Sequence, residues 1–73
     1  MDRENLFIIF KTAIENKSEA FGFYQKAAMN TPDPASKKLF EEFARTEEYH
    51  LNKLKDRYRE LRETIPETQQ PKV

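Results

Sequence analysis

The 73-residue sequence contains no cysteine, no tryptophan and a single glycine, and its 13 basic side chains are balanced by 13 acidic ones. Without cysteine the chain has no disulfide frame, thiolate zinc site, iron–sulfur cluster or cysteine nucleophile. A net charge of zero argues against a nucleic-acid-binding protein, which would carry a basic surplus on one face. We therefore expect one small domain at most, with no nucleic-acid partner.

Long hydrophobic runs are also missing. No apolar stretch approaches the roughly 18 residues of a membrane-spanning helix. The first four residues, MDRE, lack the basic-then-apolar order of a signal peptide. The default expectation is a cytoplasmic protein that contacts no membrane.

Proline marks the ends of two long segments. Residues 2–30 and 35–64 contain no proline, and the sequence TPDP at residues 31–34 separates them. These proline positions predict a hairpin over residues 1–65, with a first helix over about 2–30, a turn at 31–34 and a second helix over about 34–64. Asp33 is placed to cap the second helix, with Pro34 at its first position. The polar, proline-marked residues 66–73 are predicted to be a flexible tail.

Hydrophobic periodicity supports two helices and shows no strand pattern. At 100° per residue, each segment carries an inward stripe, which on the first helix covers about 160°. The first stripe contains Leu6, Phe10, Ala13, Lys17, Ala20, Tyr24 and Ala27, flanked by Phe7, Ile14, Phe21 and Ala28. The second contains Phe40, Ala44, Glu47, Leu51, Leu54, Tyr58 and Leu61, with Phe43 and His50 beside them.

The width of these stripes predicts an assembly of two chains. Two helices cannot bury so wide a stripe on each other, whereas two hairpins related by a two-fold axis close into a four-helix bundle. The predicted fold class is therefore all-α, an antiparallel hairpin that forms a homodimer. Ile8 and Phe23 project away from the stripe. They are either scattered surface residues or a second interface that joins dimers.

Three polar residues interrupt the apolar stripes, and they are the candidate functional residues. Lys17 lies at the centre of the first stripe and Glu47 at the centre of the second, with His50 three residues further on. Lys17 and Glu47 are each thirteen residues from the turn, counted from Asn30 and Pro34, so the hairpin places them at one level. Glu47 and His50 have the spacing with which one helix face presents a carboxylate and an imidazole to the same metal ion.

The chain resembles the rubrerythrin branch of the ferritin-like superfamily at residues 19–28 (EAFGFYQKAA), 33–34 (DP), 38–44 (KLFEEFA) and 47–50 (EEYH). In size it is similar to the two-helix encapsulated ferritins, which build their site across a dimer. The resemblance covers roughly residues 10–62. It implies a four-helix bundle that binds a pair of iron ions and oxidises Fe(II) with dioxygen or peroxide, often within larger shells or rings.

The sequence departs from this family at one ligand. The resemblance implies a metal-binding glutamate seven residues before the tyrosine, but Lys17 has that position relative to Tyr24. With Lys in place of Glu, the site is neutral before any metal binds, and added divalent ions leave a surplus of positive charge. Three alternatives remain: a metal-free interior with a Lys17–Glu47 pair, a mononuclear or weakened metal site on Glu47 and His50, or a di-iron centre with a further ligand.

Two classes of function follow. The first is a metal-handling or ferroxidase-like protein with iron on Glu47 and His50, in which Tyr24 donates a hydrogen bond to a ligand carboxylate. Any reduction of peroxide by such a protein would need an outside electron donor. The second is a metal-free oligomerisation or binding module, in which Tyr24 fills the bundle. A minor option is cargo of a protein compartment, with the tail as its address. Other acidic residues are expected in solvent, namely Glu15, Glu19, Glu41, Glu42 and Glu48.

Overall fold

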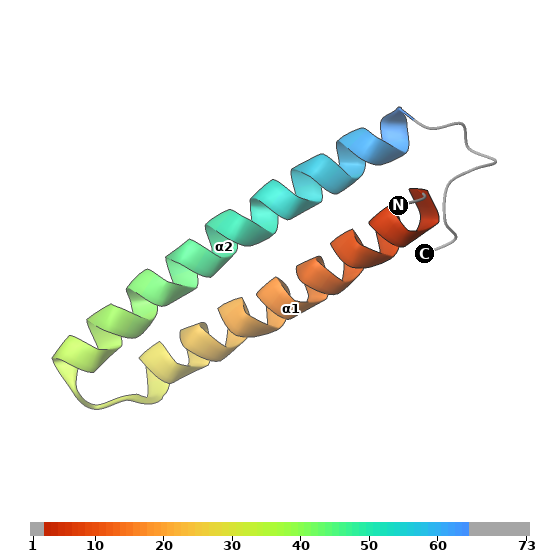
Figure 1. The fold of residues 1–73 in the computed structure, drawn as a ribbon. Coiled ribbons are helices and arrows are strands. Elements are labelled where there is room, and N and C mark those ends of the chain that lie inside the picture. The colour runs from red at the N-terminus through yellow and green to blue at the C-terminus, as the bar shows by residue number, and fades with distance from the viewer. Residues whose placement is uncertain (1–2, 65–73) are drawn as a thin grey trace.

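The computed structural model describes residues 3–64, which form two α-helices and the turn between them. Helix α1 spans Arg3–Asn30 and helix α2 spans Pro34–Glu63, and the two lie side by side in opposite directions (Figure 1). The all-helical hairpin predicted from the proline positions is confirmed. The tail expected over residues 66–73 lies outside the described residues.

The turn is fixed by hydrogen bonds at both helix ends. At the end of α1, the backbone N–H of Thr31 donates to the carbonyl of Ala27 over 3.0 Å. At the start of α2, the Asp33 carboxylate accepts the backbone N–H of Ser36 at 3.0 Å and also the Ser36 hydroxyl. Pro34 takes the first helical position, where a missing N–H costs no hydrogen bond. Asp33 is thus the N-cap that the sequence predicted.

The core between the helices runs along the flank of the α1 stripe. Among the residues that the structure describes, four hydrophobic side chains are buried, namely Phe7, Ala28, Ala44 and Leu51. On α1 this seam follows every seventh residue, because seven residues nearly complete two helical turns. Its members on α1 are Phe7, Ile14, Phe21 and Ala28, of which Ile14 and Phe21 are half-buried.

The centre of the α1 stripe is only half covered. Two cylinders that touch along a line shield a narrow strip, and a stripe of about 160° is wider than that strip. The half-buried residues are Leu6, Phe10, Ala13, Lys17, Ala20, Tyr24 and Ala27. A single hairpin therefore leaves a broad, partly apolar face next to its seam.

Several large hydrophobic side chains are exposed on the hairpin. They are Ile8, Ile9, Phe23, Met29, Leu39, Phe43 and Tyr49. Ile8 and Phe23, which the periodicity placed outside the stripe, are among them. Within residues 3–64, neither helix combines the length and the apolar character needed to cross a membrane.

Candidate functional site

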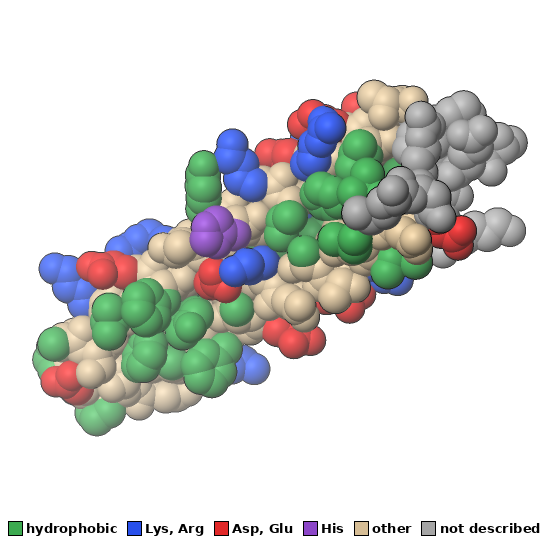
Figure 2. Space-filling model, viewed as in Figure 1, with side chains coloured by type: hydrophobic (Ala, Val, Ile, Leu, Met, Phe, Trp, Pro, Cys, Tyr) green, Lys and Arg blue, Asp and Glu red, His purple; other side chains and the backbone are tan. Residues whose placement is uncertain are grey.

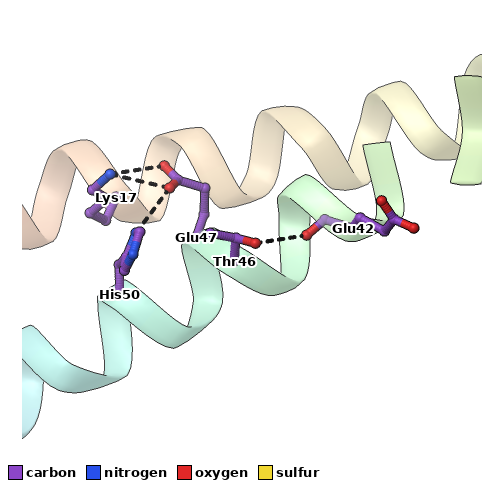
Figure 3. A network of polar contacts seen from close by, with 5 residues as sticks. All are labelled: Lys17, Glu42, Thr46, Glu47 and His50. Carbon is purple, nitrogen blue, oxygen red and sulfur yellow. Dashed lines mark hydrogen bonds and ion pairs between the residues drawn. The ribbon is translucent and has the colours of Figure 1, made fainter. Parts of the chain in front are cut away.

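An ion pair between the two helices lies near the middle of the hairpin. The Lys17 ammonium on α1 donates to both carboxylate oxygens of Glu47 on α2, at 3.1 Å to Oε1 and 3.3 Å to Oε2 (Figure 3). The Glu47 side chain is 14% exposed and that of Lys17 is 37% exposed. The two residues are equally far from the turn, so the antiparallel topology itself brings them to one level.

His50 joins this pair from the next turn of α2. Its Nδ1 lies 3.4 Å from Oε1 of Glu47, the oxygen that is also closer to Lys17 (Figure 3). The imidazole is 47% exposed in the single hairpin. Figure 2 shows the histidine beside an acidic and a basic side chain, with hydrophobic groups toward the turn and toward the opposite end. The three polar residues singled out by the sequence therefore contact one another through Glu47 on a partly apolar face. We call Lys17, Glu47 and His50 the polar group.

The environment of Glu47 favours its charged form. Burial alone would raise the pKa of its carboxyl, since a charge is less stable away from water. Hydrogen bonds from Lys17 and His50, together with electrostatic attraction, act in the opposite direction and lower the pKa of Glu47 below its usual value. Glu47 is therefore an anion held by a cation from the neighbouring helix.

Tyr24 lies toward the turn from this group, among aromatic rings. Its ring centroid is 6.3 Å from that of Phe40 in a stacked arrangement, 5.3 Å from Phe43 and 5.5 Å from Phe23. We call these four residues the turn-end aromatic cluster. Tyr24 and Phe43 also line a shallow hollow of about 200 Å³ together with Thr46 and Glu47. This hollow connects the aromatic cluster to the ion pair, and the sequence did not single out Thr46 or Phe43 as part of the site.

In the described part of the chain, no further acidic group completes a metal site. Among residues 3–64, there is no cluster of three or more His, Cys, Asp or Glu side chains placed to hold a metal ion. Glu15 and Glu19 project about 160° from Lys17 around α1. As expected, these and the other surface acids are exposed, namely Glu15, Glu19, Glu41, Glu42 and Glu48.

A second hollow, larger than the one beside Glu47, lies elsewhere on the hairpin. It has a volume of about 670 Å³, and its lining includes Gly22, Ala44 and Glu48. Gly22 projects about 140° from Lys17 on α1, and Glu48 about 100° from Glu47 on α2. This groove therefore opens away from the ion pair and contains neither Glu47 nor His50.

Comparison with protein families identifies the scaffold. The family model described as Rubrerythrin matches residues 2–72, nearly the whole chain. The chain belongs to the rubrerythrin family. This ferritin-like family typically binds iron. No curated protein and no solved structure matches the chain.

The residues of this rubrerythrin-family hairpin do not fit a pair of iron ions. Each chain offers one carboxylate and one imidazole at this level, and an ammonium already contacts both oxygens of the carboxylate. A divalent ion bonded to Glu47 would lie within about 5 Å of the Lys17 nitrogen. At an effective dielectric constant near 20, the repulsion between them is roughly 7 kcal/mol. The charge of Lys17 therefore opposes the metal chemistry typical of the family.

Proposed function

We propose that this rubrerythrin-family chain works as a homodimer. Two hairpins would join through the face that carries Lys17, Glu47 and His50 and would form a four-helix bundle that serves as an oligomerisation or binding module. The observation that carries this proposal is the half-covered stripe of α1. Its seven members are all partly exposed, while only four hydrophobic side chains within the described residues are buried. A core of four residues is small for a stable domain of this length.

The side chains around the polar group suit a second copy of the chain. Phe43 is 41% exposed, and burying such a ring stabilises an assembly by about 1.5–3 kcal/mol. On α1, Ala13, Ala20 and Ala27 recur every seventh residue and are half-buried. Small side chains in this arrangement let a neighbouring helix approach closely. A two-fold axis uses every such contact twice.

The polar group fits the centre of such a dimer without adding net charge. Each Lys17–Glu47 pair is neutral, so two pairs can enter a shared interior with their charges already compensated. Once enclosed in the dimer, this ion pair would fix the register of the packed helices even if it added little stability. It would align two hairpins at their midpoints and disfavour shifted arrangements.

Sedimentation equilibrium combined with circular dichroism over a dilution series tests the dimer. We expect a mass of two chains, and a loss of helical signal that follows dissociation, since dilution and unfolding are coupled in an obligate dimer. A full helical signal in demonstrably monomeric protein would contradict the proposal.

A second candidate is a metal site shared by two chains. Glu47 and His50 are three residues apart on one helix face, and Glu47 Oε1 lies 3.4 Å from His50 Nδ1, which favours joint coordination of one ion. Iron in this position would supply Fe(II) oxidation, and reduction of peroxide would need an outside electron donor. Metal analysis of protein purified without a chelating tag, followed by an Fe(II) oxidation assay, tests this candidate. Substoichiometric iron and a background rate would exclude it.

A further inference from the structure

The cation that contacts Glu47 belongs to the chain itself. We infer that Lys17 is a resident cation that takes the place of a metal ion in this rubrerythrin-family bundle, so that the core assembles without metal and excludes divalent ions. The inference rests on the proposed dimer, because only a dimer brings two copies of Lys17, Glu47 and His50 into one interior. It goes further in assigning the lysine a definite role at the site.

The geometry supports this role for Lys17. Its Nζ contacts both carboxylate oxygens of Glu47, at 3.1 and 3.3 Å, as a cation chelated by a carboxylate does. The partner oxygen Oε1 is also the one that His50 approaches at 3.4 Å. A metal ion bonded to the same carboxylate and imidazole would lie on this side of Glu47, about 2.0–2.2 Å from its oxygens if the ion were zinc. The Lys17 ammonium already contacts the two carboxylate oxygens that such an ion would use.

Charge counting gives the same result for the two-chain assembly. Two Lys17 and two Glu47 side chains sum to zero, so one divalent ion leaves a surplus of two positive charges and two ions leave a surplus of four. A Lys17→Glu substitution changes the total to minus four, which two divalent ions balance. A Lys17→Gln substitution changes it to minus two, which one ion balances. The metal content of the variants should therefore follow the charge at residue 17.

Co²⁺ is a suitable probe, because its visible absorption reports coordination by imidazole and carboxylate without any turnover. The full chain, freed of metal with a chelator, is titrated with Co²⁺ while absorption and bound metal are measured. We expect no bound Co²⁺ in the natural chain, about one ion per dimer in Lys17→Gln and about two in Lys17→Glu. Co²⁺ should raise the midpoint temperature of thermal unfolding by roughly 10 °C in Lys17→Glu and should leave that of the natural chain unchanged.

Lys26→Glu is the matched control. Lys26 is an exposed lysine of the same helix, away from the ion pair, and its substitution changes the net charge by the same amount. This variant should bind no Co²⁺. If it binds as much as Lys17→Glu, non-specific attraction explains the metal and the inference is wrong.

Repulsion between two carboxylates can unfold the Lys17→Glu variant in the absence of metal. In that case Co²⁺ should restore the helical circular dichroism signal, and Lys17→Gln, which remains neutral at residue 17, should still fold and bind. Stoichiometric Co²⁺ in the natural chain, or absence of Co²⁺ from both Lys17 variants, would overturn the inference. Sedimentation of the natural chain tests the dimer separately, so the two proposals can fail independently.

Discussion

The two ends of the hairpin use the same kind of residue in opposite ways. At the open end, where α1 begins and α2 ends, Phe7 is 2% exposed and its ring meets Tyr58 edge to face at 5.5 Å. At the turn end, three aromatic rings contact that of Tyr24, yet two of them, Phe23 and Phe43, remain at the surface. Aromatic packing thus closes the open end within one chain, whereas at the turn end it builds an outward patch.

The difference follows from where each ring lies around its helix. Phe7 belongs to the flank of the α1 stripe that faces α2, so α2 covers it. Phe43 lies about 100° away from the buried Ala44 around α2, and Phe23 lies about 120° from Lys17 around α1. Their rings therefore point away from the seam. We conclude that the open end mainly supports the hairpin and the turn end mainly supports the proposed dimer.

The largest expected effect tests the open end. Phe7→Ala removes the most deeply buried ring of the described residues and leaves a cavity beside Tyr58, which should lower the free energy of unfolding by about 3–5 kcal/mol. Urea denaturation at fixed protein concentration measures this loss. Ile8→Ala is the control, because Ile8 is adjacent and 55% exposed, and it should change the free energy by less than about 0.5 kcal/mol. Equal effects would mean that the seam does not hold the hairpin together.

The next largest effect tests the turn end. Phe43→Ala should weaken the dimer about 100-fold, since roughly 1.5 kcal/mol is lost at each of two symmetry-related positions. Sedimentation equilibrium measures the dissociation constant. Tyr49→Ala is the matched control: Tyr49 is an exposed aromatic residue of the same helix, 60% accessible, whose ring lies beneath Lys53 rather than in the cluster. An unchanged dissociation constant for Phe43→Ala would remove the turn end from the interface.

A smaller effect tests the polar group between the two ends. Lys17→Met, Glu47→Gln and the double variant form a thermodynamic cycle that isolates the interaction between these side chains. Since the Lys17 side chain is 37% exposed in the single hairpin, we expect a coupling of about 1 kcal/mol, at the upper end of the range for exposed pairs. Urea denaturation of the four proteins gives the value. A coupling near zero would mean that the contact has no part in fixing the register.

Much of this architecture could be predicted from the sequence because local chemistry determines it. The prolines limited the helices, Asp33 and Pro34 defined the start of α2, and an antiparallel turn placed Lys17 opposite Glu47 whatever the details of packing. Periodicity also identified the faces of both helices. Each of these features depends on residues close in sequence or on counting from a single turn.

The rotation of one helix against the other could not be predicted in the same way. Periodicity describes each helix separately and does not determine which part of a wide stripe meets the neighbour, so the seam at Phe7 and Ala28 emerged only in the structure. The hollow beside Glu47, lined by Phe43 and Thr46, depends on that rotation too. Periodicity likewise does not predict how exposed Lys17 is, because its exposure depends on what packs against the face that carries it.

The smallest effect concerns the cap that positions the turn end. Hydrogen bonds from the Ser36 hydroxyl and backbone N–H lower the pKa of Asp33 below its usual value of about 3.9. The stabilising contribution of the charged cap is therefore present above about pH 4 and is lost as the pH falls through the lowered pKa. Asp33→Asn keeps an N-cap acceptor but does not titrate, so the natural chain should be slightly more stable than this variant at pH 6 and lose that advantage at pH 2. Urea denaturation at both pH values measures the difference. Ser36→Ala removes one of the two donors and should therefore reduce the stability advantage of the natural chain over Asp33→Asn at pH 6. If that advantage is the same at both pH values, the charge of Asp33 does not contribute to the turn.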